Sequence, residues 1–416
     1  MVCFELREEE EHMSERLYYG DAYLRDFEAR VVACRNRQDG PWLTLDRSAF
    51  YPTSGGQPYD TGILTAAGQV CRVLDVQVDD EGNVWHRTDV PLAPGDLVQG
   101  SIDWPRRFDH MQQHGGEHIL AGSLYALYQG YVHGLHVSAD FSTIDVTLPG
   151  GRMRLSAEEI TALETLANRR VQLDAPIRCW FPSHEELSDL PLRKEPTVEG
   201  NVRVVAAGDF EMVACGGTHP SSTGQIGLIK VLACAPSRGK MRLTFVCGAR
   251  AIRHYQAIFQ AAEEASALLS IPPESLSKAV MHLLDEQTAL REQLTACRLK
   301  QSRAEAEALM AQAQTLPCGA RLIRAVLSDT DMESLKTVAD ALIGQAGCIA
   351  LLAAPKAEGF HLLFARHAGI AQDMAALLRA SGAKGGGRPD FAQGSAQTAE
   401  TLEKAAAMLI DNQGPA

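Results

Sequence analysis

The sequence predicts an α+β protein with several domains, and three observations carry that prediction. The chain has 416 residues, which at about 100–200 residues per domain corresponds to two to four domains. The first hundred residues show short alternating apolar runs, whereas residues 251–315 are almost purely helical in composition. Hydrophobic residues make up 45% and charged residues 22%, as is ordinary for a folded globular protein.

The N-terminal part predicts a short flexible start followed by a small β-barrel. Residues 1–16 are acidic and polar, which is typical of a frayed terminus. From residue 17 to 102, apolar runs such as 29–34 and 70–74 alternate with turn sequences such as Gln-Asp-Gly at 38–40. We therefore expect a barrel subdomain over residues 17–102.

Residues 103–250 predict a mixed α/β core. Residues 108–129 have the pattern of a helix, and residues 142–146 that of a strand. A second helix is expected directly after Ser156, because serine is a good N-cap and acidic residues follow in the first turn. Strands are expected again from about residue 201 to 246.

The helical segment, residues 251–315, is expected to act as a linker between domains. After Pro272-Pro273, apolar or neutral residues recur at spacings of four and three, which predicts a heptad seam. The seam consists of Val280, Leu283, Gln287, Leu290, Leu294, Cys297, Gln301, Ala304 and Ala308, preceded by Leu276. It is compatible with a long helix packed on its own protein and with a dimerising or spacer arm. Residues 316–416 return to an α/β pattern with a glycine-rich loop at 385–390.

Charge and cysteine content restrict the location and the partners. The formal net charge is −13, so binding to nucleic acid would require local basic patches. The ten cysteines include no CxxC pair, which indicates a reducing compartment. We expect a cytoplasmic protein, neither secreted nor membrane-spanning, because neither a signal-peptide pattern nor an 18-residue apolar run is found.

The strongest local signal is His114-Gly-Gly-Glu-His118. Residues four apart share one face of a helix, so the two histidines can hold one cation. Two glycines are costly inside a helix, which indicates that the backbone closely approaches another part of the chain. Taken alone, this HxxxH pair is a weak signal.

Cys215-Gly-Gly-Thr-His219 supplies a second pair of metal-ligand residues. One thiolate and three imidazoles favour Zn²⁺, and we expect one zinc ion per chain. Four protein ligands would also suit a closed structural site. If the zinc is catalytic, it becomes five-coordinate, or one ligand is loose, or it positions the substrate while water is activated elsewhere.

Together these motifs resemble those of the editing domains of alanyl-tRNA synthetase and of the free-standing AlaX proteins. The HxxxH and CxxxH pairs match, as does FYPTSGGQPYDTG at residues 50–62. The C-terminal GGGRPDFAQG at residues 385–394 is similar to the DHH-associated domain that ends alanyl-tRNA synthetase. The resemblance runs in order over residues 17–413, and we expect a form without an activation domain. We therefore expect the long AlaX form, with an editing core at 103–250 and a DHH-associated domain for tRNA binding and oligomerisation at 316–416.

The resemblance implies hydrolysis of the ester that joins serine, or glycine, to alanine tRNA. A site built to bond a hydroxyl would discriminate serine from alanine. The implied amino-acid pocket consists of Ser48, where the family usually has threonine, with Gly55, Gly56 and Gln57. The implied catalytic candidates are His136, Asp145 and Gln57, with Asp145 orienting a ligand histidine.

Binding of tRNA and dimerisation are expected at the C-terminal end. Gly386, Gly387 and Arg388 suit close approach to a phosphate backbone, although a tight turn with Arg388 in a salt bridge is the alternative. Residues 316–416 hold nine Lys and Arg against ten Asp and Glu, so binding would depend on a local patch. We expect a homodimer formed through the helical and C-terminal regions.

Two rival functions are compatible with parts of the sequence. The HxxEH pattern also occurs in inverted zinc peptidases, where Glu117 would be the general base and a distant glutamate such as Glu195 the third ligand. That hypothesis leaves Cys215 and His219 unexplained. The other rival is a non-catalytic tRNA-binding or dimerisation protein with a structural zinc.

Overall fold

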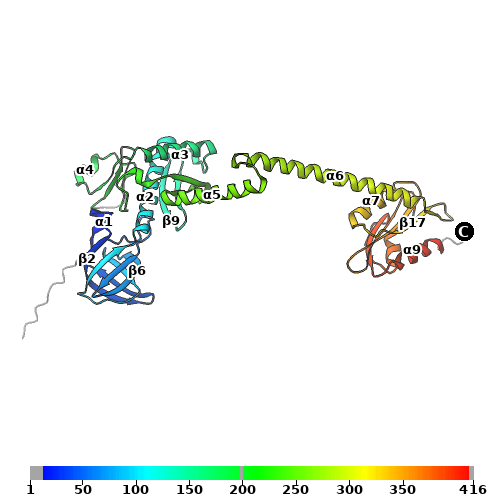
Figure 1. Ribbon diagram of the computed structural model, residues 1–416, viewed down its shortest axis with the longest axis horizontal. Helices are drawn as coiled ribbons and strands as arrows, with labels where there is room; N and C mark the ends of the chain where they lie inside the picture. The colour runs from blue at the N-terminus through cyan, green and yellow to red at the C-terminus, as the bar shows by residue number, and fades with distance from the viewer. Residues whose placement is uncertain (1–12, 197–199, 412–416) are drawn as a thin grey trace, which may run out of the picture. The chain divides into compact units, whose positions relative to one another are not determined.

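The computed structural model describes residues 13–196 and 200–411 (Figure 1). These residues belong to two units, Met1–Glu264 and Ala265–Ala416, each with its own packing. Among the described helices, none has both the length and the apolar character needed to cross a membrane.

A closed six-stranded barrel opens the first unit and confirms the predicted barrel. Closure satisfies both edges of the sheet, and side chains that alternate inward fill the interior with residues such as Val31, Leu45 and Leu64. In spatial order the strands are β2 (Asp26–Arg37), β3 (Gly40–Leu45), β7 (Val84–Thr88), β6 (Gln69–Val78), β5 (Gly62–Ala66) and β8 (Leu97–Ile102).

A short segment before the barrel is ordered. Strand β1 (Glu15–Arg16) pairs in parallel with β4 (Arg47–Ser48) and leads into helix α1 (Leu17–Gly20). The flexible start predicted for residues 1–16 therefore includes two strand residues. Residues 1–12 lie outside the described part of the chain.

Helix α2 (Trp104–Tyr128) forms the centre of the first unit. It begins four residues before the predicted start, because Asp103 caps it by accepting from the Arg106 amide and proline occupies the first turn. Its side chains Ile119, Leu120 and Leu124 join the core cluster of the adjacent antiparallel sheet. That sheet has the order β14 (Ile229–Ser237), β15 (Lys240–Cys247), β10 (Ser142–Thr147) and β9 (Tyr131–Val137).

The other elements of the core follow the predicted pattern. Helix α3 (Ala157–Gln172) starts directly after Ser156, which forms a capping box with Glu159. A small sheet is built from β11 (Ile177–Trp180), β12 (Val204–Ala207) and β13 (Glu211–Ala214), with the short helix α4 (His184–Asp189) after β11. The end of β13 leads directly into Cys215.

The two glycines of the HxxxH segment are explained by close packing. A Cβ atom on Gly116 would lie 2.1 Å from the sulfur of Cys247, and one on Gly115 would lie 3.1 Å from Ile226. Strand β15 and the segment after His219 therefore press directly onto the backbone of α2. This contact fixes the distance between the helix that carries two histidines and the loop that carries the other pair.

The predicted helical segment consists of two helices. Helix α5 (Gly248–Leu269) ends before the Pro272-Pro273 break, and α6 (Leu276–Met310) follows a 3₁₀ turn at Pro273–Ser275. The seam residues Val280, Leu283, Leu290 and Leu294 are between 47% and 57% exposed. Only near its end, at Ser302 and Ala306, does α6 have buried residues.

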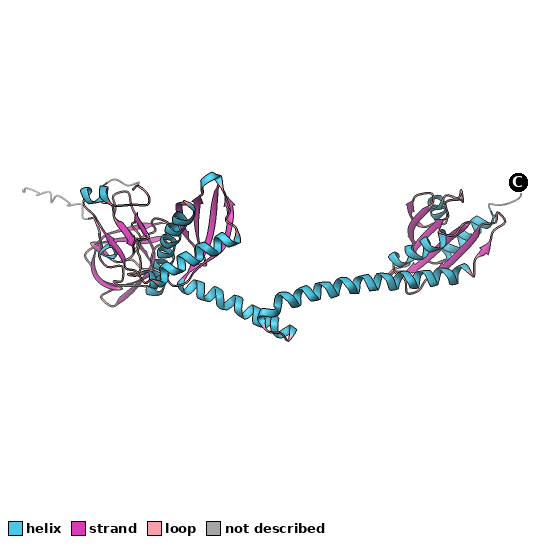
Figure 2. Cartoon of the chain, turned by 90° about the horizontal axis from the view of Figure 1, so that it is seen from above, coloured by secondary structure: helices cyan, strands magenta, loops and turns pink. Residues whose placement is uncertain are grey.

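The second unit contains a mixed six-stranded sheet with helices on both faces (Figure 2). Strand β18 is buried on both faces, because its alternate residues Leu351 and Leu352 join different core clusters. The strand order is β16 (Gln314–Thr315), β17 (Arg321–Val326), β18 (Cys348–Pro355), β19 (Phe360–Arg366), β21 (Phe391–Ala396) and β20 (Lys384–Gly387). The helices are α7 (Met332–Ile343), α8 (Met374–Ala380) and α9 (Glu400–Asp411).

Candidate metal centre

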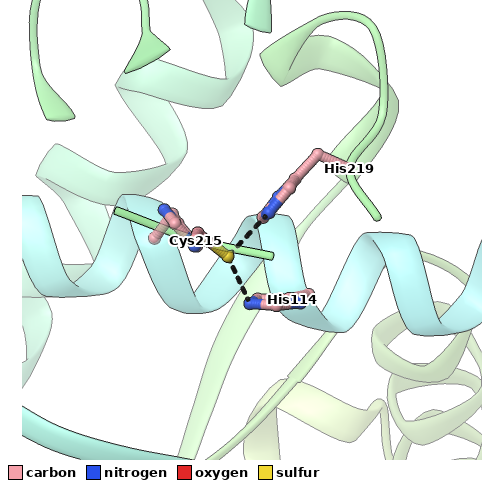
Figure 3. A group of neighbouring side chains, drawn as sticks. His114, Cys215 and His219 are labelled. Carbon is pink, nitrogen blue, oxygen red and sulfur yellow. Dashed lines mark hydrogen bonds between the residues drawn. The ribbon is translucent and has the colours of Figure 1, made fainter. Parts of the chain in front are cut away.

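Two histidines of α2 meet a cysteine and a histidine from the loop after β13. One ligand atom from each of His114, His118, Cys215 and His219 lies within 4.8 Å of the other three. The Cys215 sulfur is 3.4 Å from Nε2 of His114 and 3.3 Å from Nε2 of His219 (Figure 3). The fold thus brings together residues that are about a hundred positions apart in sequence.

The loop that carries Cys215 and His219 is fixed by close packing and by one arginine. A Cβ on Gly217 would lie 2.1 Å from Cε1 of His114, so only glycine allows the loop to pass over that imidazole. Arg203, which is buried, donates to the carbonyl oxygens of Cys215 at 3.1 Å and of Gly217 at 2.8 Å. Side chain and backbone together therefore hold the thiol beside the helix.

Gln57 orients His114 through Nδ1, the ring nitrogen that does not contact the Cys215 sulfur. Its Oε1 is 2.8 Å from Nδ1 of His114 and accepts from the Thr218 amide at 3.2 Å, while its Nε2 donates to the Thr218 hydroxyl at 2.8 Å. Because Oε1 can only accept, Nδ1 of His114 carries the proton and Nε2 offers its lone pair to the cluster. Gln57 is fully buried, and the structure shows its side chain in contact with His114 and Thr218.

Burial keeps the cluster uncharged in the absence of a cation. It lowers the pKa of His114 to about 3 and holds the pKa values of His118 and His219 well below the ordinary range, so all three imidazoles are neutral. It also raises the pKa of Cys215 to about 12. Nδ1 of His118 and Nδ1 of His219 are buried without a partner among the described residues.

This donor set fits a zinc ion. Neutral imidazoles and a cysteine sulfur are the ligands that zinc prefers, and the four converge without a carboxylate among them. A bound dication would favour the thiolate and reverse the effect of burial on Cys215. The structure thus shows a group of His and Cys side chains that could hold a metal ion.

Glu117 and Glu195, the two glutamates of the peptidase hypothesis, have different surroundings in the structure. A Glu117 carboxylate oxygen is 3.7 Å from Nε2 of His118, and burial raises the pKa of Glu117 to about 7. Glu195 is exposed and is not part of the four-residue cluster. The HxxEH hypothesis requires a glutamate as third ligand, whereas in the structure Cys215 and His219 join the two histidines.

The residues of the predicted amino-acid pocket differ in their exposure and contacts. Ser48 is fully buried, and its hydroxyl is 2.7 Å from Nε2 of His86 and accepts from the Phe50 amide. Gly55 is exposed, whereas Gly56 packs so tightly that a Cβ would lie 1.9 Å from the Leu135 carbonyl oxygen. The amino-acid pocket of Ser48, Gly55, Gly56 and Gln57 stays a prediction.

His136 and Asp145, the other catalytic candidates, are not among the four residues of the cluster. Asp145 is bound by Arg242, whose Nε and NH2 donate to its two oxygens at 2.7 and 2.8 Å, and this contact lowers its pKa. His136 is exposed and pairs with Thr143 on the neighbouring strand. Strand alternation is the reason, because Ile144 faces the core on α2 and the residues on either side of it face away.

In the second unit, the predicted tRNA-binding residues lie at the edge of the sheet. Gly386 and Gly387 belong to β20, which pairs with β21 alone, and Arg388 follows them. The Arg388 side chain is 78% exposed, and its Nε lies 3.4 Å from an Asp390 oxygen. An ion pair this exposed contributes little stability, so the guanidinium can exchange partners.

A pocket of about 660 Å³ opens beside the cluster, with Cys215 and Gly216 in its wall. Its side-chain lining is aromatic and basic, with Tyr19 and Phe181 beside Arg16, Lys194 and Arg203. No local sequence pattern indicates this pocket, because its residues come from β1, α1, two barrel loops, the segments around β11 and β12, and the loop after β13.

Comparison with known proteins gives a consistent set of relatives. Residues 5–106 match the family of tRNA synthetases class II (A), and residues 202–243 match the threonyl and alanyl tRNA synthetase second additional domain. The alanyl-tRNA editing protein AlaX-L of Pyrococcus horikoshii is 31% identical over 395 residues, covering 92% of this chain and 94% of that protein.

Alanine–tRNA ligases are similar to the chain over part of their length. Those of Pyrococcus abyssi and Archaeoglobus fulgidus are 32% and 34% identical over 95% and 92% of this chain. The chain covers 43% and 42% of these two ligases, so it spans less than half of their length.

Proposed function

The chain belongs to the family of the alanyl-tRNA editing protein AlaX-L, and from that premise we propose that it removes serine, or glycine, from wrongly charged alanine tRNA. The reaction is ester hydrolysis. Water adds to the ester carbonyl, the bond to the ribose oxygen breaks, and the products are the free amino acid and tRNA with a free hydroxyl. The convergence of His114, His118, Cys215 and His219 beside an open pocket is the observation that supports this function best.

We propose that these four residues hold one Zn²⁺. Bound zinc supplies Lewis acidity at the point where the pocket meets the cluster. The protein's own contribution is positioning. Gln57 keeps the proton of His114 on Nδ1, and Arg203 fixes the carbonyl groups of the loop that carries Cys215.

We also propose that the second unit contributes tRNA binding and that α6 contributes dimerisation. Gly386, Gly387 and the exposed Arg388 suit contact with a phosphate backbone. The exposed seam of α6 has the heptad spacing of a coiled coil, and a second copy of the same helix is its natural partner. A cytoplasmic location accords with a role in translation quality control.

The test uses purified full-length protein with alanine tRNA charged with serine, glycine or alanine. We expect zinc-loaded protein to release serine and to leave alanine attached, and we expect chelation to stop the release. Cys215→Ala should lose zinc and activity together. Cys318→Ala removes an exposed cysteine of the second unit and should change neither.

A non-catalytic protein with a structural zinc is the second candidate, because four protein donors can complete a tetrahedron. It predicts tRNA binding without release of serine or glycine. Zinc-loaded protein that binds alanine tRNA and leaves both esters intact would establish this candidate and refute the editing function.

A further inference from the structure

The pocket beside the cluster has the dimensions and the lining of a nucleotide site. Its volume of about 660 Å³ lies within the range of about 300–1,000 Å³ that is usual for small-molecule sites. Cys215 and Gly216 form part of its wall, so a molecule in the pocket has one end beside the candidate metal ligands. A bound group larger than an amino acid is therefore accommodated next to the reacting centre.

Two aromatic rings line the pocket at this end. The rings of Tyr19 and Phe181 meet edge to face, with centroids 5.6 Å apart. The Tyr19 hydroxyl would be 3.4 Å from a Cβ on Gly216, which places this ring beside the loop of Cys215. Phe181 is 46% exposed, so one face of the pair is open to a planar ligand. Nucleobases stack on such rings.

Positive charge surrounds these rings, although the chain as a whole carries −13. Arg16, Lys194 and Arg203 line the pocket together with the acidic Glu195. The Arg203 guanidinium lies 5.2 Å from the centroid of the Tyr19 ring, and its Nε is buried without a partner among the described residues. Arg203 is 6% exposed, so this donor belongs to a built site rather than to a free surface chain.

We propose that this pocket binds the terminal nucleotide of the tRNA, with its base stacked on Tyr19 and Phe181. Its phosphate lies toward Arg16 and Lys194, which supply cationic donors. Its ribose, which carries the ester, lies toward Cys215 and Gly216. The inference rests on the proposed function, since an ester on the last ribose requires the last base to lie near the reacting centre.

The test measures deacylation of serine-charged alanine tRNA by full-length Phe181→Ala and Tyr19→Ala. Each base stacked on an aromatic ring contributes enough binding that we expect KM to rise by about 5- to 100-fold, with a much smaller change in kcat. Phe181→Trp keeps a flat aromatic face and should restore KM. Tyr255→Ala, which removes an exposed aromatic residue of α5 outside this pocket, should leave KM unchanged.

A binding measurement separates this inference from the proposed function. We expect adenosine monophosphate to bind the zinc-loaded wild-type chain in calorimetry and to bind Phe181→Ala at least about fivefold more weakly. If the wild type releases serine but neither variant changes KM or nucleotide binding, the pocket assignment is wrong and the editing function stands. If the wild type releases no amino acid, the editing function fails. The pocket assignment is then tested by nucleotide binding alone. Binding by the wild type that weakens in Phe181→Ala supports the assignment. A wild type that binds no nucleotide, or a Phe181→Ala variant that binds it equally well, overturns it.

Discussion

Replacing Gln57 by leucine tests whether a buried amide orients a metal ligand. The change keeps the approximate size of the side chain and removes its polar atoms. Two buried donors, Nδ1 of His114 and the amide of Thr218, then lose their acceptor. A buried donor without a partner costs about 1–3 kcal/mol, so two of them should lower the free energy of unfolding by about 2–6 kcal/mol.

The change should also weaken metal binding, which is measured separately from the stability of the fold. His114 without its Nδ1 partner is free to rotate and to change tautomer, and loss of such outer contacts usually weakens metal binding about 10- to 100-fold. We expect Gln57→Leu to show that loss when zinc is titrated against a chromophoric chelator, together with slower serine release at limiting zinc. Urea unfolding measures the stability separately.

Two matched variants make the result interpretable. Gln57→Glu keeps an acceptor for His114 and for the Thr218 amide, so it should bind zinc within about threefold of the wild type. Gln99→Leu makes the same exchange at an exposed site on β8 and should change neither quantity. If Gln57→Leu folds and binds zinc as tightly as the wild type, Gln57 does not position His114 and the reasoning is refuted.

Three further predictions concern packing, pH and assembly. Gly116→Ala should destabilise the chain by about 1–3 kcal/mol in thermal unfolding, because the added Cβ would lie 2.1 Å from the Cys247 sulfur. This cost should outweigh the higher helix propensity of alanine. An unchanged or raised Tm would contradict the packing. Burial lowers the pKa of His86 to about 4, below the unfolded value of about 6.5, so its contribution to stability is present above pH 6.5 and is lost as pH falls to 4. In metal-free protein, His86→Asn should therefore flatten the pH dependence of unfolding by up to about 3 kcal/mol over that window, and an equal slope in both proteins would count against it. Leu290→Asp on α6 should convert the proposed dimer into a monomer in light scattering, whereas Thr288→Asp should leave the dimer intact. A wild type that is monomeric at all concentrations would refute the proposed dimer.

Local signals predicted the elements well, because they depend on neighbours in sequence. Ser156 and the acidic residues after it gave the start of α3, and alternating apolar runs gave the barrel. Helix α2 begins four residues before the expected start, since the Asp103 cap is followed by one tryptophan, a proline and two arginines, which form no apolar periodicity.

The site was predictable only in part. Spacing identified His114, His118, Cys215 and His219, because each pair is local and has its own chemical signature. The contacts that give other residues their roles join distant segments. Gln57 and Thr218 are 161 positions apart, and no local pattern reports such a pairing.

The expectation for Asp145 depends on the direction of its side chain. Its strand alternates between buried and partly exposed residues, so Ile144 and Asp145 must point to opposite faces. With Ile144 facing α2, a carboxylate next to it in sequence faces away from the helix that bears His114 and His118. The outer contact that the structure shows for His114 comes from Gln57, in the segment that leads into β5 of the barrel.

The position of Cys215 bears on whether the candidate metal centre is catalytic or structural. A structural zinc ties elements together and gains nothing from an opening beside its ligands, whereas a catalytic zinc needs access for its substrate. Three of the four donors, the histidines, are buried, while Cys215 borders the pocket that also contains Tyr19 and Phe181. The opening therefore lies on the sulfur side of the cluster. Among the four donors, Cys215 is therefore the one that lines the pocket, and this favours a centre that a substrate can reach over a closed structural site.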